Sequence, residues 1–341
     1  MIRRIMILLA VLASGFLAAG GATATQADTS LIGAGSTFVA PLVALWTPEV
    51  AKAYGIKVTY GAVGSGAGIN SITSRVVDFG ASDAPMSPSQ FSACKGCVQV
   101  PWALGATAIM YNVRGVPNHL RLSGKAIAGI FMGSIKRWND PAIQKLNKGV
   151  KLPSTGIVPI HRSDNSGTTY NLTDYLSSVN TSWRSQIGRG VAVNWPGGLA
   201  GKGSSGVSAV LKQTDGGVAY ADIAYALKNH FNFAAVQNRA GKFLLPGIRS
   251  IEAAAKTIVR VAPNNSGISI VNPAKSQKTA YPIATFTYVI LPEKTSKAKT
   301  LRTFVYWALT HGQSVGAPLF FAPIPLVVLR ASLKTLTLIH T

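Results

Sequence analysis

The sequence is poor in acidic residues and in cysteine. Its 341 residues contain 33 Lys and Arg against 11 Asp and Glu, a formal charge of +22 at pH 7, and 2 cysteines. Such a basic balance is compatible with nucleic acid, anionic surfaces or anionic solutes as partners. The basic residues are scattered from Lys52 to Lys334, however, without the dense run interleaved with aromatics that is typical of nucleic-acid surfaces. We therefore expect no specific nucleic-acid partner.

Metal and redox chemistry also have little support in the sequence. The five histidines show no ligand spacing, and the cysteines form a single CKGC motif, Cys94 to Cys97. In a cytosolic protein this motif would suggest redox work or half of a zinc site. In an exported protein a small structural disulfide is the better interpretation. We predict no metal and no cofactor, and a possible disulfide between Cys94 and Cys97.

The N-terminus has the pattern of an export signal. Arg3 and Arg4 precede an apolar stretch at 5–19, and the small residues at 22–24 and 25–27 are two candidate cleavage motifs. The alternative is a membrane anchor, but the apolar stretch is shorter than the ~20 residues of a membrane-spanning helix. No cysteine follows it for lipid attachment. We predict a signal peptide at 1–27 and a periplasmic mature chain.

Hydrophobic periodicity predicts strands alternating with helices, which favours an α/β fold. The segment 39–54 has helical spacing, with Leu42, Leu45, Trp46 and Val50 on one side. Two long apolar extended stretches, 98–113 and 281–291, are predicted to cross between domains. Further strands are predicted at 56–60, 76–81, 157–161 and 216–220, and further helices at 69–75, at 125–131, from Asp140–Pro141 and at 300–310.

Four loops rich in Gly, Ser and Thr each follow a predicted strand and are expected to open a helix. Small residues let an anion approach the backbone, and helix N-termini offer unpaired N–H groups. Ordinary helix caps would have the same composition, so each loop alone is weak support. The loops are 33–38, 64–68, 82–85 and 162–169, and their candidate hydroxyl donors are Thr37, Ser65, Ser166 and Thr168.

Three charged residues in these loops favour an oxyanion site. Arg162 supplies a planar, permanently charged fork suited to phosphate, and Asp164 could hold it in place. Asp83 is unexpected beside an anion, unless it accepts a hydrogen bond from a ligand that carries a proton. Phosphate carries one and sulfate does not, so Asp83 would discriminate between them. The competing interpretation of Asp83 is a turn-capping residue before Pro85.

The chain resembles the periplasmic phosphate-binding proteins of the phosphate ABC transporter, a PstS-like family. The resemblance rests on GAGSTF (33–38), VGSGAG (63–68), VDFGASDAPMS (77–87), GIFMGSIKRWNDPAIQKLN (129–147), RSDNSGTT (162–169), NWPGGLAGKGSSG (194–206), PIATFTYVIL (282–291) and the run at 318–331. It departs from the family at Asn165, where we expect Gly, and in the basic stretch 238–278.

The resemblance implies a two-domain α/β clamshell, with mixed sheets flanked by helices and the ligand in the interdomain cleft. Domain I would combine 28–104 with 281–341, and domain II would span 105–280. The phosphate contacts it implies are Thr37, the backbone N–H of Phe38, Ser65, Asp83, Arg162, Asp164, Ser166, Gly167 and Thr168.

The resemblance also implies a monomeric binding protein that delivers inorganic phosphate to the permease subunits of an ABC importer with a cytoplasmic ATPase. An ester-hydrolysing enzyme is the alternative, but we find no metal-ligand cluster in the sequence. His161 precedes Arg162 in a strand, so the two side chains should point to opposite faces. Arsenate remains open as a second ligand, because it carries the same proton as phosphate.

Overall fold

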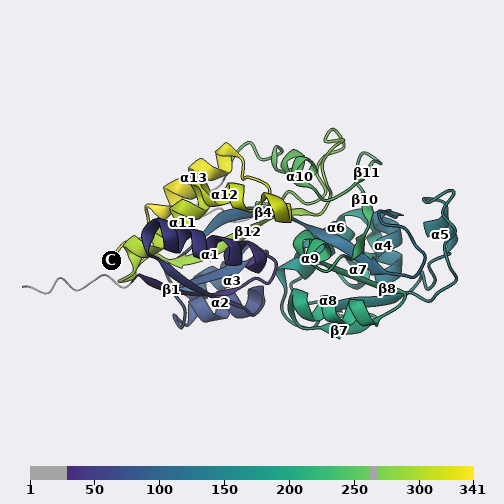
Figure 1. The fold of residues 1–341 in the computed structure, drawn as a ribbon, viewed down its shortest axis with the longest axis horizontal. Helices are drawn as coiled ribbons and strands as arrows, with labels where there is room; N and C mark the ends of the chain where they lie inside the picture. Colours follow the sequence, from purple (N-terminus) through teal and green to yellow (C-terminus); the bar gives the residue numbers. More distant parts are fainter. Residues whose placement is uncertain (1–28, 262–267) are drawn as a thin grey trace, which may run out of the picture.

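The computed structural model describes residues 29–261 and 268–341 of the chain, so the predicted signal peptide at 1–27 lies outside the described residues. The described chain forms two α/β lobes, which lie side by side along the long axis of the molecule (Figure 1). Parallel and antiparallel strand pairs occur in the same sheet, as predicted for a mixed-sheet clamshell.

The first lobe is built from both ends of the described chain. Three N-terminal strands pair in parallel and a C-terminal strand joins them antiparallel. These are β1 (Ser30–Gly35), β2 (Lys57–Ala62), β3 (Phe79–Ser82) and β12 (Ala284–Pro292). The helical elements are α1 (Ala40–Tyr54), α2 (Ser65–Thr73), α3 (Pro88–Cys94), α11 (Ala298–Thr310), α12 (Gly312–Val315), the 3-10 turn η2 (Ala317–Leu319) and α13 (Leu326–Leu336).

Helices cover both faces of this part of the sheet because side chains alternate along each strand. In β12, Val289 and Leu291 belong to the large core that includes residues of α1 and α11. Ile290, between them, belongs to a smaller core with Ile69 and Ile72 of α2. The loops that leave the carboxyl ends of β1 and β3 are therefore held between two packed layers.

The second lobe repeats the layered design. Its strands are β6 (Val158–Arg162), β7 (Leu199–Gly201), β8 (Gly217–Asp222) and β9 (Asn232–Phe233), and its helices are α4 (Gly124–Phe131), α5 (Pro141–Gln144), α6 (Gly167–Val179), α7 (Thr181–Gln186), α8 (Gly203–Gln213) and α9 (Ile223–Lys228). A small sheet of β5 (Arg121–Leu122), β10 (Ala235–Gln237) and β11 (Phe243–Leu244) and helix α10 (Ile248–Ala255) complete the described chain.

One long strand, β4 (Cys97–Asn112), belongs to both lobes. From Cys97 to Ala106 it pairs with β12, and from Thr107 to Asn112 it pairs with β8. The full strand order is β2-β1-β3-β12-β4-β8-β6-β7, with β9 added beside β4. The apolar stretch at 98–113 is therefore a crossing strand, as predicted, and it is buried almost throughout because layers cover both of its faces.

Most predicted elements are present, and four details of the prediction are wrong. Leu45 is on the exposed side of α1, which buries Leu42, Val43, Trp46 and Val50. Val76 is 70% exposed, and the strand predicted at 76–81 begins only at Phe79. The loop predicted at 64–68 is the first turn of α2, which begins at Ser65. The loop at 82–85 does not open a helix directly, because α3 begins at Pro88 behind its own capping residue, Ser87.

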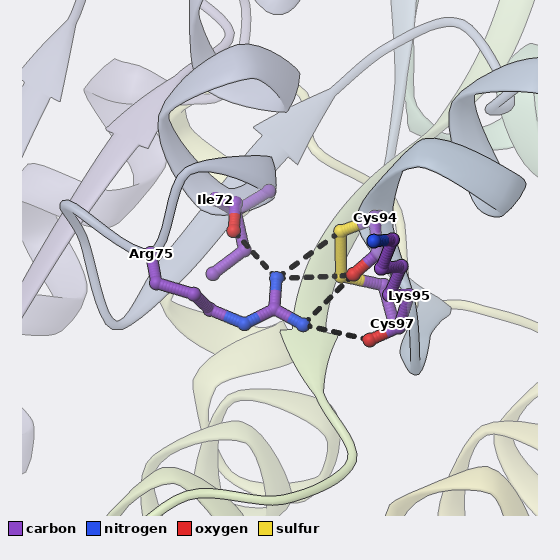
Figure 2. Close-up of a disulfide and its surroundings, with 5 residues drawn as sticks. All are labelled: Ile72, Arg75, Cys94, Lys95 and Cys97. Carbon is purple, nitrogen blue, oxygen red and sulfur yellow. Dashed lines mark hydrogen bonds between the residues drawn. A yellow bond between two sulfur atoms is a disulfide. The ribbon is translucent and has the colours of Figure 1, made fainter.

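The predicted disulfide between Cys94 and Cys97 is present and joins the end of α3 to the start of β4. Figure 2 shows the guanidinium of Arg75 against it. One terminal nitrogen lies 3.3 Å from each sulfur and the other donates to the carbonyls of Cys94 and Lys95, at 2.8 and 3.1 Å. Arg75 also bonds the carbonyl of Ile72. The motif thus has a structural role, fastening the α3–β4 turn to the end of α2.

Among residues 29–261 and 268–341, no helix combines the length and the apolar character that crossing a membrane requires. The apolar run at 317–329 is divided between η2, an extended segment and the start of α13.

Candidate functional site

The first wall of the candidate site is the turn after β1. Ser36 donates its hydroxyl hydrogen to Asp83 Oδ1, and its hydroxyl oxygen accepts from the backbone N–H of Phe38 at 3.0 Å. The carbonyl of Ser36 accepts from the hydroxyl of Tyr60 at 2.8 Å. Thr37 and Phe38 are both buried. Hydrogen bonds from groups of the same lobe therefore order this turn, independently of its contacts with the other lobe.

Ser65 and Asp83 lie together beside this turn. Ser65 Oγ lies 3.4 Å from Asp83 Oδ2 and accepts from the backbone N–H of Asp83 at 3.3 Å. Thr287 of β12 also bonds the Asp83 carboxyl. Asp83 is 2% exposed. Three hydroxyl groups from three segments thus surround one buried carboxyl group.

Burial sets the electrostatic state of Asp83. Loss of solvation raises its pKa from 3.8 to about 6, although the hydroxyl bonds from Ser36, Thr287 and Ser65 and the positive charge of Arg162 act in the opposite direction. Asp83 can therefore accept a hydrogen bond as a carboxylate near neutral pH and becomes protonated in mild acid.

The second wall is the segment from β6 into α6. Arg162 Nε and Nη2 donate to the two oxygens of Asp164, at 2.7 and 2.5 Å. The Arg162 side chain is 2% exposed and that of Asp164 13%. Burial opposes ionisation of Asp164, but the bonds and charge of Arg162 outweigh it and lower the Asp164 pKa. The predicted Arg–Asp contact is confirmed, and it occupies one edge of the guanidinium.

The N-terminus of α6 completes this wall. Ser166 is the N-cap, and its hydroxyl accepts from the backbone N–H of Thr169 at 3.2 Å. The hydroxyl of Thr168 is fully buried without a hydrogen-bond partner. A buried hydroxyl without a partner carries an energetic cost, which a bound oxyanion would remove. The first turn of α6 therefore offers the donors that an anion needs.

The two walls meet across the cleft. The backbone N–H of Gly167 donates to Ser65 Oγ at 3.1 Å, and that of Gly66 donates to the carbonyl of Asn165 at 3.0 Å. A Cβ on Gly167 would lie 2.7 Å from Asp83 Cβ, so only glycine permits this approach. The lobes are thus closed on each other. All nine residues predicted as phosphate contacts lie in the segments that form these two walls.

Comparison with known proteins identifies the family. The family model described as "PBP superfamily domain" matches residues 20–311. The chain is 38% identical over 327 residues to "Phosphate-binding protein PstS" of Pasteurella multocida, covering 95% of this chain and 92% of that protein. It is 37% identical over 302 residues to the protein of the same name from Xylella fastidiosa, covering 87% and 82%. The chain belongs to the PstS family.

Solved structures agree with this placement in the PstS family at the level of fold. A high-affinity periplasmic phosphate-binding protein, PfluDING, crystallised with phosphate, superposes with a TM-score of 0.71 at 22% identity, covering 89% of this chain and 93% of that one. A putative phosphate ABC transporter substrate-binding protein from Clostridium perfringens, also with bound phosphate, gives 0.64 at 15% identity, covering 87% and 100%. The clamshell fold of this PstS-family chain is thereby confirmed.

Several residues of the site were missed by the sequence analysis. Ser36 lies inside the GAGSTF motif but was passed over for its neighbours. Ser204, at the start of α8, contacts Thr37 across the cleft. The hydroxyl of Tyr220 accepts from the backbone N–H of Arg162 at 3.1 Å and lies 2.6 Å from Thr169 Oγ1. Its position in a buried strand gave no sign of a polar role.

A second buried acid, Asp222, was also missed. It ends β8 and caps α9, accepting from the backbone N–H of Ala224 at 2.9 Å. Its other oxygen is buried without a partner. Burial, with a smaller effect from nearby Asp83, raises the pKa of Asp222 well above its usual range. Asp222 is therefore a buried acid behind the site that holds its proton more tightly than an exposed aspartate does.

His161, which precedes Arg162 in the sequence, does not bond the polar side chains of the site. The ring of His161 stacks on Trp195, with centroids 5.0 Å apart, and its Nδ1 lies 3.1 Å from the carbonyl of Arg162. Among the described residues, no group of three or more His, Cys, Asp or Glu side chains is arranged to hold a metal ion.

Proposed function

We propose that this PstS-family chain binds inorganic phosphate between its two lobes and delivers it to an ABC-type importer. The relatives in Pasteurella multocida and Xylella fastidiosa carry the name phosphate-binding protein, and both solved neighbours were crystallised with phosphate. In the proposed complex the anion accepts from Arg162, which Asp164 orients, and from the hydroxyls of Thr37, Ser65, Ser166 and Thr168. It also accepts from the backbone N–H groups of Phe38 and Gly167, which exchange their present bonds to Ser36 and Ser65 for bonds to the ligand.

The observation that carries this proposal is the buried carboxyl group of Asp83 facing an arginine and a helix N-terminus. Arg162 and the first turn of α6 would attract any tetrahedral oxyanion. Asp83, 2% exposed, adds an acceptor where a fully ionised anion would meet repulsion. A protonated phosphate oxygen can donate to it, and sulfate has no hydrogen to donate. The site is thus selective for a ligand with a proton.

Binding rather than catalysis is the role that the geometry favours. Phosphoryl transfer usually recruits metal ions or a nucleophile activated by a neighbouring base. The hydroxyl of Ser36 donates to Asp83, and that of Ser166 caps a helix. His161, the nearest histidine in sequence, is stacked on Trp195. Among the described residues Ser166 has no base beside it, and the carboxyl group that Ser36 contacts, Asp83, is the one to which the proposal assigns the proton of the ligand.

We extend the proposal to domain limits and cellular setting. Domain I would comprise 28–104 and 281–341 and domain II 105–280, which is supported by the change of partner strand along β4 after Ala106. Export through a signal peptide at 1–27 would place the mature, monomeric protein in the periplasm. There the closed form would dock on permease subunits, whose cytoplasmic ATPase supplies the energy.

The proposal is tested by calorimetric titration of the mature protein. We expect strong 1:1 binding of phosphate and negligible binding of sulfate at pH 7.5, with arsenate as a weaker competitor. Sulfate binding as strong as phosphate binding would remove the role given to Asp83. Absence of phosphate binding would remove the proposed function altogether.

A further inference from the structure

Thr37 of the first wall is held from the opposite lobe at two points. The hydroxyl of Tyr225, in α9, donates to the carbonyl of Thr37 at 2.8 Å. Ser204, at the start of α8, meets the side chain of Thr37, with the two hydroxyl oxygens 2.9 Å apart and the Ser204 N–H donating to Thr37 Oγ1 at 3.2 Å. The second lobe therefore contacts both the backbone carbonyl and the side-chain hydroxyl of Thr37, which belongs to the first lobe.

Tyr225 is well anchored in its own lobe. It packs in the second-lobe core with residues of β8 and α8, and it is 8% exposed. Asp222 caps the helix that carries it, and Ser205 of α8 also bonds its hydroxyl. Burial raises the pKa of Tyr225 to about 12, so the hydroxyl keeps its hydrogen across the physiological range. It is thus a fixed donor aimed across the cleft.

The carbonyl of Ser36, one residue before Thr37, provides a comparison for the carbonyl of Thr37. Tyr60, in β2, donates to the carbonyl of Ser36 at the same distance, 2.8 Å. Tyr60 packs against the first-lobe core, and its ring stacks with that of Phe79, with centroids 6.1 Å apart. Two consecutive carbonyls therefore accept from two tyrosines: the partly buried Tyr60 of the same lobe and the buried Tyr225 of the opposite lobe.

We propose that Tyr225 is a positioning residue that fastens the closed lobes through the carbonyl of Thr37 and so slows phosphate release. This inference rests on the proposed function. A bond between lobes is made only when they close, so it favours the closed state over the open one. The bond of Tyr60 lies within one lobe and survives opening, so it leaves that equilibrium unchanged.

The experiment compares Tyr225→Phe with Tyr60→Phe by stopped-flow phosphate binding and release. Loss of one buried neutral hydrogen bond should make release about fivefold to tenfold faster in Tyr225→Phe, with association within about twofold of wild type. Tyr60→Phe loosens the first wall equally in the open and closed states, so any change should fall on association, with release within about twofold of wild type. The phosphate-to-sulfate ratio should be unchanged in both variants, since neither hydroxyl contacts Asp83.

A second variant keeps the inference testable if Tyr225→Phe folds poorly. Ser204→Ala removes the hydroxyl contact with Thr37 but keeps the backbone N–H that donates to it. This variant should also accelerate release, and phosphate-free scattering should show a more open molecule than wild type. Equal release rates in Tyr225→Phe and Tyr60→Phe would overturn the inference. That result leaves the proposed function intact, whereas a wild-type protein that fails to bind phosphate would overturn the function itself.

Discussion

The two walls of the cleft each carry one carboxyl group, and the two groups are in opposite electrostatic situations. In the second wall, Arg162 outweighs the effect of burial and lowers the pKa of Asp164. In the first wall, burial raises the pKa of Asp83 to about 6. Asp164 therefore serves its own arginine, whereas Asp83 remains available to a ligand. Under the proposed function, the second wall would supply affinity for oxyanions and the first wall would select among them.

The largest expected effect comes from removing the cation of the second wall. Arg162→Met should lower phosphate affinity about thirtyfold to several thousandfold, because it leaves Asp164 without its cation beside the anion; breaking a buried charge pair costs about 2–5 kcal/mol. Titration calorimetry measures the loss. Arg189→Met is the matched control, since Arg189 pairs with Asp174 at 3.0 Å but its side chain is 53% exposed. Similar losses in the two variants would mean that general positive charge, and not the second wall, supplies affinity.

The carboxyl of the first wall should control selectivity. Asp83→Asn supplies an amide that can donate to a fully ionised anion, so the phosphate-to-sulfate affinity ratio should fall at least about a hundredfold. Asp164→Asn should weaken both anions while changing their ratio less than about threefold. Competition titrations with the two anions give these ratios. The proposed division between the walls is wrong if Asp164→Asn changes the ratio more than Asp83→Asn does.

Selectivity should also depend on pH. Because Asp83 loses its proton as pH rises through about 6, the charge that repels sulfate is present above that pH and is lost below it. Sulfate competition measured from pH 8 to pH 5 should therefore strengthen below about 6 in wild type. Asp83→Asn should show no such step.

The raised pKa of Asp83 also affects the stability of the ligand-free protein, which should fall as pH rises. A raised pKa means that the folded state holds the proton more tightly than the unfolded chain does. The contribution of Asp83 to stability is thus full below about pH 4 and is lost as pH rises through about 6. Thermal melts of wild type and Asp83→Asn should diverge across that interval. Parallel curves would contradict the assigned pKa.

The smallest expected effect tests one donor of the second wall. Thr168 and Thr107 both bury a hydroxyl without a partner. Thr168→Val should weaken phosphate binding about fivefold to tenfold, the range for one lost hydrogen bond. Thr107→Val, in the crossing strand, should change it less than about twofold. If Thr107→Val has the larger effect, the unpartnered hydroxyl of Thr168 is not a ligand donor.

Much of this architecture could be predicted from local sequence pattern. The helix at 39–54 and the crossing strand at 98–113 have the expected periodicity, and the structure places α1 and β4 there. The prediction failed where a single residue fits the local hydrophobic pattern but is exposed in the structure. Leu45 fits a helical stripe but faces solvent, and Val76 suits a strand but lies in an exposed turn. Hydrophobic periodicity predicts the average buried face of a helix or strand, but it does not show which single residues at the edge of that face are exposed.

The sequence by itself determined the order of the elements, the small-residue turns that follow β1 and β6 and the pairing of Arg162 with Asp164, because these depend on neighbours within a few residues. Only the tertiary structure decided which loops face each other, how deeply Asp83 is buried, and that Tyr60 and Tyr225 hold consecutive carbonyls from different lobes. The bonds across the cleft join segments about a hundred residues apart or more. They arise from how the lobes close around β4, which no local pattern records.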